Sequence, residues 1–104
     1  LKFMRRIVLL CSAGVSTSLL VRKMEEEAAR QGYDCSVSFF PIAEAGSAVQ
    51  LADVLMLAPQ AKHQLGELKV RYPKVHFDVI PEKLYGEMDA PAILDLAQKA
   101  AGDY

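Results

Sequence analysis

Hydrophobic residues along the chain alternate between short strand-like runs and helical periodicities. Residues 7–10 form an apolar, partly β-branched run that ends in small residues, which predicts a strand that enters a loop. Beyond the loop the period changes, because Leu20, Met24 and Ala28 recur every four residues. This spacing predicts an amphipathic helix that ends at Gly32.

The rest of the chain repeats this alternation. Residues 35–40 alternate between two faces, as an edge strand does, whereas residues 54–57 are apolar throughout, as expected of a strand covered on both faces. The remaining predicted elements are helices over 43–51 and 62–72, a strand over 75–80, and a last helix with Pro91 in its first turn.

Strands that alternate with helices predict a parallel sheet with right-handed crossovers. The uniformly apolar first and third strands belong in the centre and the alternating ones at the edges, so the expected order is 2-1-3-4. We therefore expect residues 1–104 to form a single α/β domain of three layers, a four-stranded parallel sheet flanked by helices on both faces. The winding direction reverses between strands one and three. Ligands of open α/β sheets bind at such a point, here beside Cys11 and residues 58–60.

Composition narrows the classes of partner and location. Twelve basic and thirteen acidic side chains are mixed along 104 residues, so no basic stripe predicts nucleic-acid binding. Cys11 and Cys35 have no close Cys/His neighbours, so no metal is expected. The first apolar run is too short for a secretion signal or a membrane span. We expect a cytoplasmic protein that does not itself insert into the membrane.

Residues 11–18 join the first strand to the first helix and carry almost only small or hydroxyl side chains. Backbone amides are thereby free to face an anion at the positive end of the helix, and phosphate is the expected anion. A cysteine beside such donors is stabilised as thiolate, so Cys11 is the expected catalytic nucleophile. The alternative is that Cys11 packs as a small buried hydrophobe. The expected phosphate-binding residues are Ser12, Ala13, Gly14, Val15, Ser16, Thr17 and Ser18.

Familiar nucleotide motifs are absent from the sequence. Gly14 is not followed by Gly-Lys-Ser/Thr, and no G-x-G-x-x-G occurs, so we expect no nucleotide and no other cofactor.

The rival interpretation is a hydrolase like the low-molecular-weight tyrosine phosphatases, whose loop runs Cys, five residues, Arg, then Ser or Thr. Ser18 fits the last place, but Thr17 occupies the place of the arginine that holds the transferring phosphoryl group. No Asp-Pro pair lies near the C-terminus to act as an acid; the nearest match is residues 89–91. A site that captures phosphoryl without helping water to attack it is expected to be a carrier, with the hydrolase as the alternative.

The loop Cys-Ser-Ala-Gly-Val-Ser-Thr-Ser at 11–18 resembles that of IIB components in the lactose/cellobiose/chitobiose class of the phosphoenolpyruvate-dependent sugar phosphotransferase system (PTS). The resemblance extends through residues 52–54, 57–60 and 84–86 and so covers nearly the whole chain. Ala58 stands where glycine is commoner in the family, and Ala90 also replaces a glycine; neither departure involves the nucleophile.

The resemblance implies a protein-phosphocysteine–sugar phosphotransferase. A histidine of a IIA component donates a phosphoryl group to Cys11, which passes it to a β-linked disaccharide (cellobiose, chitobiose or lactose class) held by the membrane permease IIC. The sugar is reached through IIC, so this sequence does not identify it. A carrier that docks IIA and IIC in turn can work as a monomer. Gln60 and Tyr85 remain open: each either contacts the loop or simply ends an element.

Overall fold

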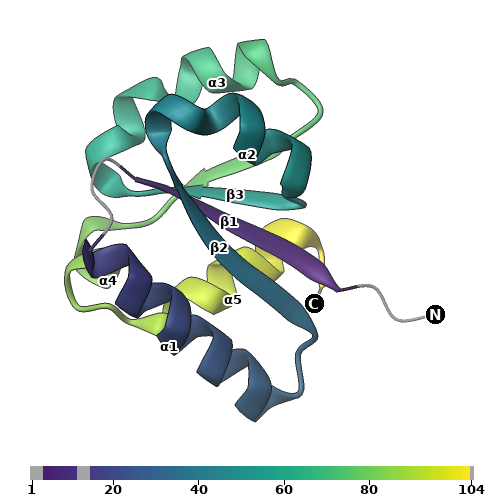
Figure 1. Ribbon diagram of the computed structural model, residues 1–104, viewed down its shortest axis with the longest axis vertical. Helices are drawn as coiled ribbons and strands as arrows, with labels where there is room; N and C mark the ends of the chain where they lie inside the picture. The colour runs from purple at the N-terminus through teal and green to yellow at the C-terminus, as the bar shows by residue number, and fades with distance from the viewer. Residues whose placement is uncertain (1–3, 12–14, 104) are drawn as a thin grey trace.

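A four-stranded parallel sheet forms the centre of the computed structural model, which describes residues 4–11 and 15–103, with the side chains of residues 15 and 16 left aside. The strands are β1 (Arg5–Cys11), β2 (Cys35–Pro41), β3 (Val54–Leu57) and β4 (His76–Val79). Their order is β2-β1-β3-β4, and every pairing is parallel (Figure 1). The predicted sheet, including the order of its strands, is therefore confirmed.

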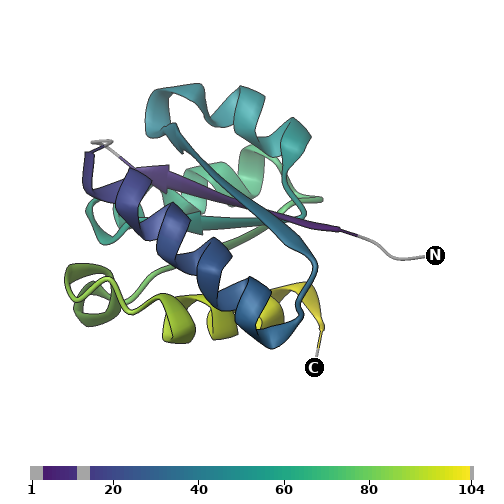
Figure 2. The same cartoon turned by 60° about the horizontal axis from the view of Figure 1, so that its bottom comes forward.

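Helices cover both faces of this sheet and complete one three-layered α/β domain (Figures 1 and 2). One layer contains α1 (Val15–Gln31), α4 (Glu82–Gly86) and α5 (Ala90–Ala101), with α1 packed beside α5. The other contains the 3₁₀ segment η1 (Ile42–Glu44), α2 (Ala45–Leu51), the 3₁₀ segment η2 (Pro59–Gln64) and α3 (Leu65–Arg71).

Alternate residues of the central strands supply two separate cores. Along β1, Ile7 and Leu9 face the layer of α1 and α5, whereas Val8 and Leu10 face the layer of α2 and α3. All four are at most 1% exposed. Burying an aliphatic side chain of this size contributes about 1.5–3 kcal/mol, so this pattern fixes both the register of β1 and the direction in which its end points.

Three predicted elements differ in detail. The helices expected over 43–51 and 62–72 each begin as a 3₁₀ segment, preceded by Pro41 and opened by Pro59 respectively. The last strand is shorter than 75–80, because only residues 76–79 pair with β3. Helix α4, which has five residues, is not among the elements that the sequence predicts. Such a short helix has no repeated apolar period to reveal it.

The first residue of β1 is joined to the segment after α5 at the amino end of the sheet. Arg5 donates from Nε and Nη2 to the two carboxylate oxygens of Asp103, at 2.8 and 2.7 Å. The Tyr33 hydroxyl donates to Asp103 Oδ2 at 2.5 Å. Burial, followed by the bond to Asp103, raises the pKa of Tyr33, so the phenol remains a donor. This cluster of Arg5, Tyr33 and Asp103 lies at the amino end of β1, away from Cys11 at its carboxyl end.

Candidate functional site

Cys11 is the last residue of β1 and pairs with Pro41 at the carboxyl edge of the sheet. Its side chain is 2% exposed, and Sγ lies 3.9 Å from the Phe40 carbonyl oxygen, a weak thiol hydrogen bond. The Ala58 N–H donates to the Leu10 carbonyl oxygen at 2.8 Å, which holds the turn after β3 beside the end of β1. Cys11 thus lies at the predicted switch point between the two central strands.

The expected phosphate-binding residues are only partly described. Residues 12–14 lie outside the described part of the chain, while Val15 and Ser16 open α1. Helix α1 therefore begins within a few residues of Cys11 along the chain. The first N–H groups of any helix have no partner in the helix itself, so its amino end attracts anions.

Thr17 and Ser18, which follow in the first turn of α1, differ in exposure. Ser18 is exposed, whereas Thr17 is fully buried. Thr17 Oγ1 lies 3.3 Å from the hydroxyl of Tyr85, and either oxygen can be the donor. This contact joins the beginning of α1 to α4, and it places the Tyr85 hydroxyl beside residue 17 of the predicted loop.

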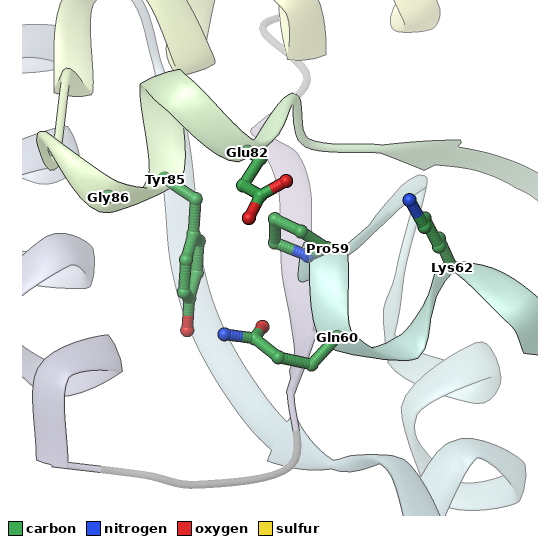
Figure 3. A pocket seen from close by; sticks show the side chains of 6 residues that line it. All are labelled: Pro59, Gln60, Lys62, Glu82, Tyr85 and Gly86. Carbon is green, nitrogen blue, oxygen red and sulfur yellow. The ribbon is translucent and has the colours of Figure 1, made fainter.

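A pocket of about 340 Å³ lies beside this contact, between η2 and α4. Figure 3 shows the Gln60 amide and the Tyr85 hydroxyl extending from opposite walls toward each other. Lys62 and Glu82 supply one charge of each sign to the lining. The residues that line it are Pro59, Gln60, Lys62, Glu82, Tyr85 and Gly86. Gln60 and Tyr85 are candidates from the sequence, whereas Lys62 and Glu82 are not, since nothing in the sequence shows that η2 and α4 face each other.

Cys35 is separated from this region by the length of the sheet. It begins β2 and pairs with Arg5, whereas Cys11 ends β1. Each strand residue advances about 3.3 Å, so the two thiols lie at opposite ends of the strands, Cys35 at the amino end and Cys11 at the carboxyl end. Burial, and then the nearby Glu25 and Asp34 carboxylates, raises the pKa of Cys35. The two cysteines therefore have different surroundings and can be tested separately.

Within residues 4–11 and 15–103, no group of three or more His, Cys, Asp or Glu side chains is arranged to hold a metal ion. The helices there also fall short of the length and hydrophobicity that a membrane-spanning helix needs.

Sequence comparison shows a family relationship over most of the chain. A family model described as "PTS system, Lactose/Cellobiose specific IIB subunit" matches residues 6–96. Two curated relatives are each 38% identical over 99 aligned residues, covering 88% of this chain and 92% of the relative. They are the galactose-specific EIIB component of the PTS of Lactococcus lactis subsp. cremoris (strain MG1363) and the cellobiose-specific EIIB component of Lactococcus lactis subsp. lactis (strain IL1403). The oligo-beta-mannoside-specific EIIB component of Bacillus subtilis (strain 168) is 33% identical and covers 83% of this chain and 85% of its own.

Solved structures share this fold. The solution structure of the cellobiose-specific phosphotransferase IIB component from Borrelia burgdorferi has a TM-score of 0.80 and 29% identity, over 97% of this chain and 94% of that one. The lactose-specific IIB domain from Streptococcus pneumoniae has a TM-score of 0.83 over 94% of this chain and 98% of that one. At 15% identity, the second comparison supports the fold alone.

Proposed function

The chain belongs to the lactose/cellobiose-specific IIB family of the PTS, and we propose that it works there as a phosphoryl carrier whose covalent site is Cys11. The observation that carries the proposal is the position of Cys11. It ends a central strand at the switch point of the sheet, and α1 begins shortly after it in the chain, at Val15. We take residues 1–104 as the IIB domain.

In the first step of the proposed cycle, a IIA component supplies the phosphoryl group from a phosphohistidine. The Cys11 thiolate attacks phosphorus, a P–S bond forms, and the P–N bond to the histidine breaks. The electron pair of that bond stays on the imidazole nitrogen, and the histidine returns to its neutral form by taking up a proton from solvent, which balances the proton that Cys11 released on forming the thiolate. Cys11 is 2% exposed, so its accessibility in this structure does not support the role. The support comes from family membership and from the position of Cys11 at the end of β1.

In the second step, a hydroxyl oxygen of the sugar attacks the phosphorus of phosphocysteine. The P–S bond breaks and its electron pair returns to sulfur as thiolate, while the hydroxyl proton passes to a base or to solvent. The products are a sugar phosphate and the free carrier, ready for another transfer. No oxidation or reduction occurs in either step.

The main-chain N–H groups of residues 12–18 are proposed to hold the phosphoryl oxygens. This part of the proposal rests on the sequence of the loop and on the start of α1 that follows it. Thr17, in place of an arginine, leaves the loop without the fixed cation that a hydrolase would use on the transferring group. Slow hydrolysis is what a carrier needs, because the phosphoryl group must survive until the sugar is reached.

The partners and sugar class follow from the family. We propose a IIA component as donor and a IIC permease as the place where the sugar is met, with this chain acting as a cytoplasmic monomer. One of these relatives is named for galactose, a monosaccharide, and two for β-linked sugars, cellobiose and oligo-beta-mannoside. On the second group we propose a β-linked disaccharide as the acceptor.

One experiment separates the carrier from the rival hydrolase. The purified chain is incubated with radiolabelled phospho-IIA, and in parallel with p-nitrophenyl phosphate. A carrier retains the label on protein and releases it only when IIC-containing membranes and a sugar are added, and it does not turn over p-nitrophenyl phosphate. Sustained release of p-nitrophenol, lost when Cys11 is replaced by serine, would instead favour the phosphatase.

A further inference from the structure

Thr17 and Tyr85 meet at the junction between the first turn of α1 and the short helix α4. They lie 68 positions apart in the chain, and their hydroxyl oxygens are 3.3 Å apart. Thr17 is fully buried, so its hydroxyl is shielded from water and its hydrogen bonds act in a low-dielectric setting. Of the two helices, α1 carries the amide donors proposed for the phosphoryl group.

Tyr85 is well placed to link α1 to α4, because both its N–H and its carbonyl group form backbone hydrogen bonds. The Tyr85 N–H donates to the Pro81 carbonyl oxygen at 3.0 Å, and the Tyr85 carbonyl oxygen accepts from the Met88 N–H at 3.1 Å. The ring is half-buried and packs against the core shared by α1 and α5. The position of its hydroxyl is therefore set by the packing of the ring.

We propose that Tyr85 is a positioning residue for phosphoryl transfer, which acts through Thr17 to hold the first turn of α1. This inference rests on the proposed carrier function and adds a residue far from the loop in sequence. The mechanism requires the N–H groups of this turn to stay aimed at the phosphoryl oxygens, since donors fixed in advance stabilise a transferring group best. The Tyr85 hydroxyl supplies that restraint from α4.

The pocket between η2 and α4 fits this role. Tyr85 forms part of its wall, and the Gln60 amide faces the Tyr85 hydroxyl across it (Figure 3). The hydroxyl thus lies between the buried Thr17 and a polar opening beside the turn after β3. Substitution of Tyr85 by phenylalanine preserves the ring and its packing and removes only this oxygen.

Tyr33 offers a matched control. It is also a half-buried tyrosine whose hydroxyl bonds another side chain, but its partner is Asp103 at the opposite edge of the sheet. Tyr33→Phe therefore removes a tyrosine hydrogen bond, in this case one to a carboxylate, without touching the first turn of α1. Any effect that both variants share reports on stability, and an effect confined to Tyr85→Phe reports on positioning.

The test measures two quantities for wild type, Tyr85→Phe and Tyr33→Phe. The first is the rate of Cys11 labelling across a range of phospho-IIA concentrations. The second, taken in the absence of phospho-IIA, is hydrogen exchange of the amides in the second turn of α1, which bond to carbonyl oxygens of the first turn. We expect Tyr85→Phe to lower the saturated labelling rate about ten-fold, to leave the half-saturating concentration unchanged, and to speed exchange about ten-fold. Tyr33→Phe is expected to change none of these.

The outcomes separate the two proposals. If wild type is labelled but Tyr85→Phe is labelled equally fast, the positioning role is wrong and the carrier function stands. An equal loss in both variants, or a change only in the half-saturating concentration, also overturns the positioning role. If wild type takes no label, the carrier function itself fails. Independently of labelling, if hydrogen exchange in α1 is the same in Tyr85→Phe and wild type, Tyr85 does not restrain the start of α1.

Discussion

Arg5 and Asp103 lie 98 positions apart in the chain, yet they form two side-chain hydrogen bonds of 2.8 and 2.7 Å. The pair joins the first residue of β1 to the segment just after α5. It lies at the amino edge of the sheet, whereas Cys11 lies at the carboxyl edge. The Arg5–Asp103 pair and the proposed chemistry therefore lie at opposite ends of the strands, so each can be perturbed independently.

Acid is expected to weaken the Arg5–Asp103 pair. The Arg5 guanidinium, followed by the Tyr33 hydroxyl, lowers the pKa of the Asp103 carboxyl. A carboxyl whose pKa is lowered by folding stabilises the fold above its unfolded value of about 3.9, and this stability is lost as the pH falls through the lower folded value. Asp103→Asn should cost about 1 kcal/mol at pH 7, and urea unfolding should show the difference from wild type shrinking below about pH 4.

Asp95→Asn is the matched control for that measurement. Asp95 pairs with Lys99 at 3.3 Å on the surface of α5, with 44% and 62% of the two side chains exposed. Such exposed pairs contribute little, so its loss should change the free energy of unfolding by less than about 0.5 kcal/mol at any pH. An equal effect of both substitutions would show that the Arg5–Asp103–Tyr33 cluster has no special role.

Two glycines should respond to alanine in opposite directions. Gly32 has φ +70° just after α1, a conformation that costs an L side chain about 1 kcal/mol. Gly66 lies within α3, and a Cβ built there meets nothing within 4 Å. We expect Gly32→Ala to lower the free energy of unfolding by about 1 kcal/mol and Gly66→Ala to raise it by about 0.5–1 kcal/mol. Shifts of the same sign in denaturant unfolding would contradict the backbone argument.

The contact between Thr17 and Tyr85 should appear as an energetic coupling. Thr17→Val removes the buried hydroxyl at nearly constant shape, and Tyr85→Phe removes its partner. We expect each single change to cost about 1–2 kcal/mol, and the double variant to cost about 1 kcal/mol less than their sum. Denaturant unfolding of the four proteins measures this coupling, and strict additivity would mean that the two hydroxyls do not interact.

Thr17→Ser gives a further check, because it retains the hydroxyl while removing a methyl group. It should keep the coupling to Tyr85 and the labelling rate better than Thr17→Val does. If both Thr17 variants lost labelling equally, shape and not the hydrogen bond would be responsible.

Much of the fold could be predicted because burial left a clear pattern. Residues 54–57 are all apolar, and the structure has β3 at those residues in a central position. The alternating residues 35–40 lie in the edge strand β2. Gly32 has the positive φ expected where a helix ends. In each case a local pattern and the tertiary structure impose the same requirement.

The site was less predictable because it depends on distant segments meeting. Nothing near Thr17 in the sequence reveals that Tyr85 lies 3.3 Å away, since that contact depends on where α4 packs. Lys62 and Glu82 share a pocket for the same reason. The roles of residues 11–18 toward phosphate stay predictions, and residues 12–14 lie outside the described part of the chain.

Peptide mapping of the phosphorylated chain tests the central claim most directly. Wild type, Cys11→Ser and Cys35→Ser are each incubated with phospho-IIA, and intact mass and peptide masses are recorded under conditions that preserve phosphocysteine. We predict that wild type and Cys35→Ser gain one phosphoryl group, carried by the peptide that contains residue 11, and that Cys11→Ser gains none. A phosphoryl group on Cys11→Ser, or its loss in Cys35→Ser alone, would contradict the assignment of Cys11 as the carrier.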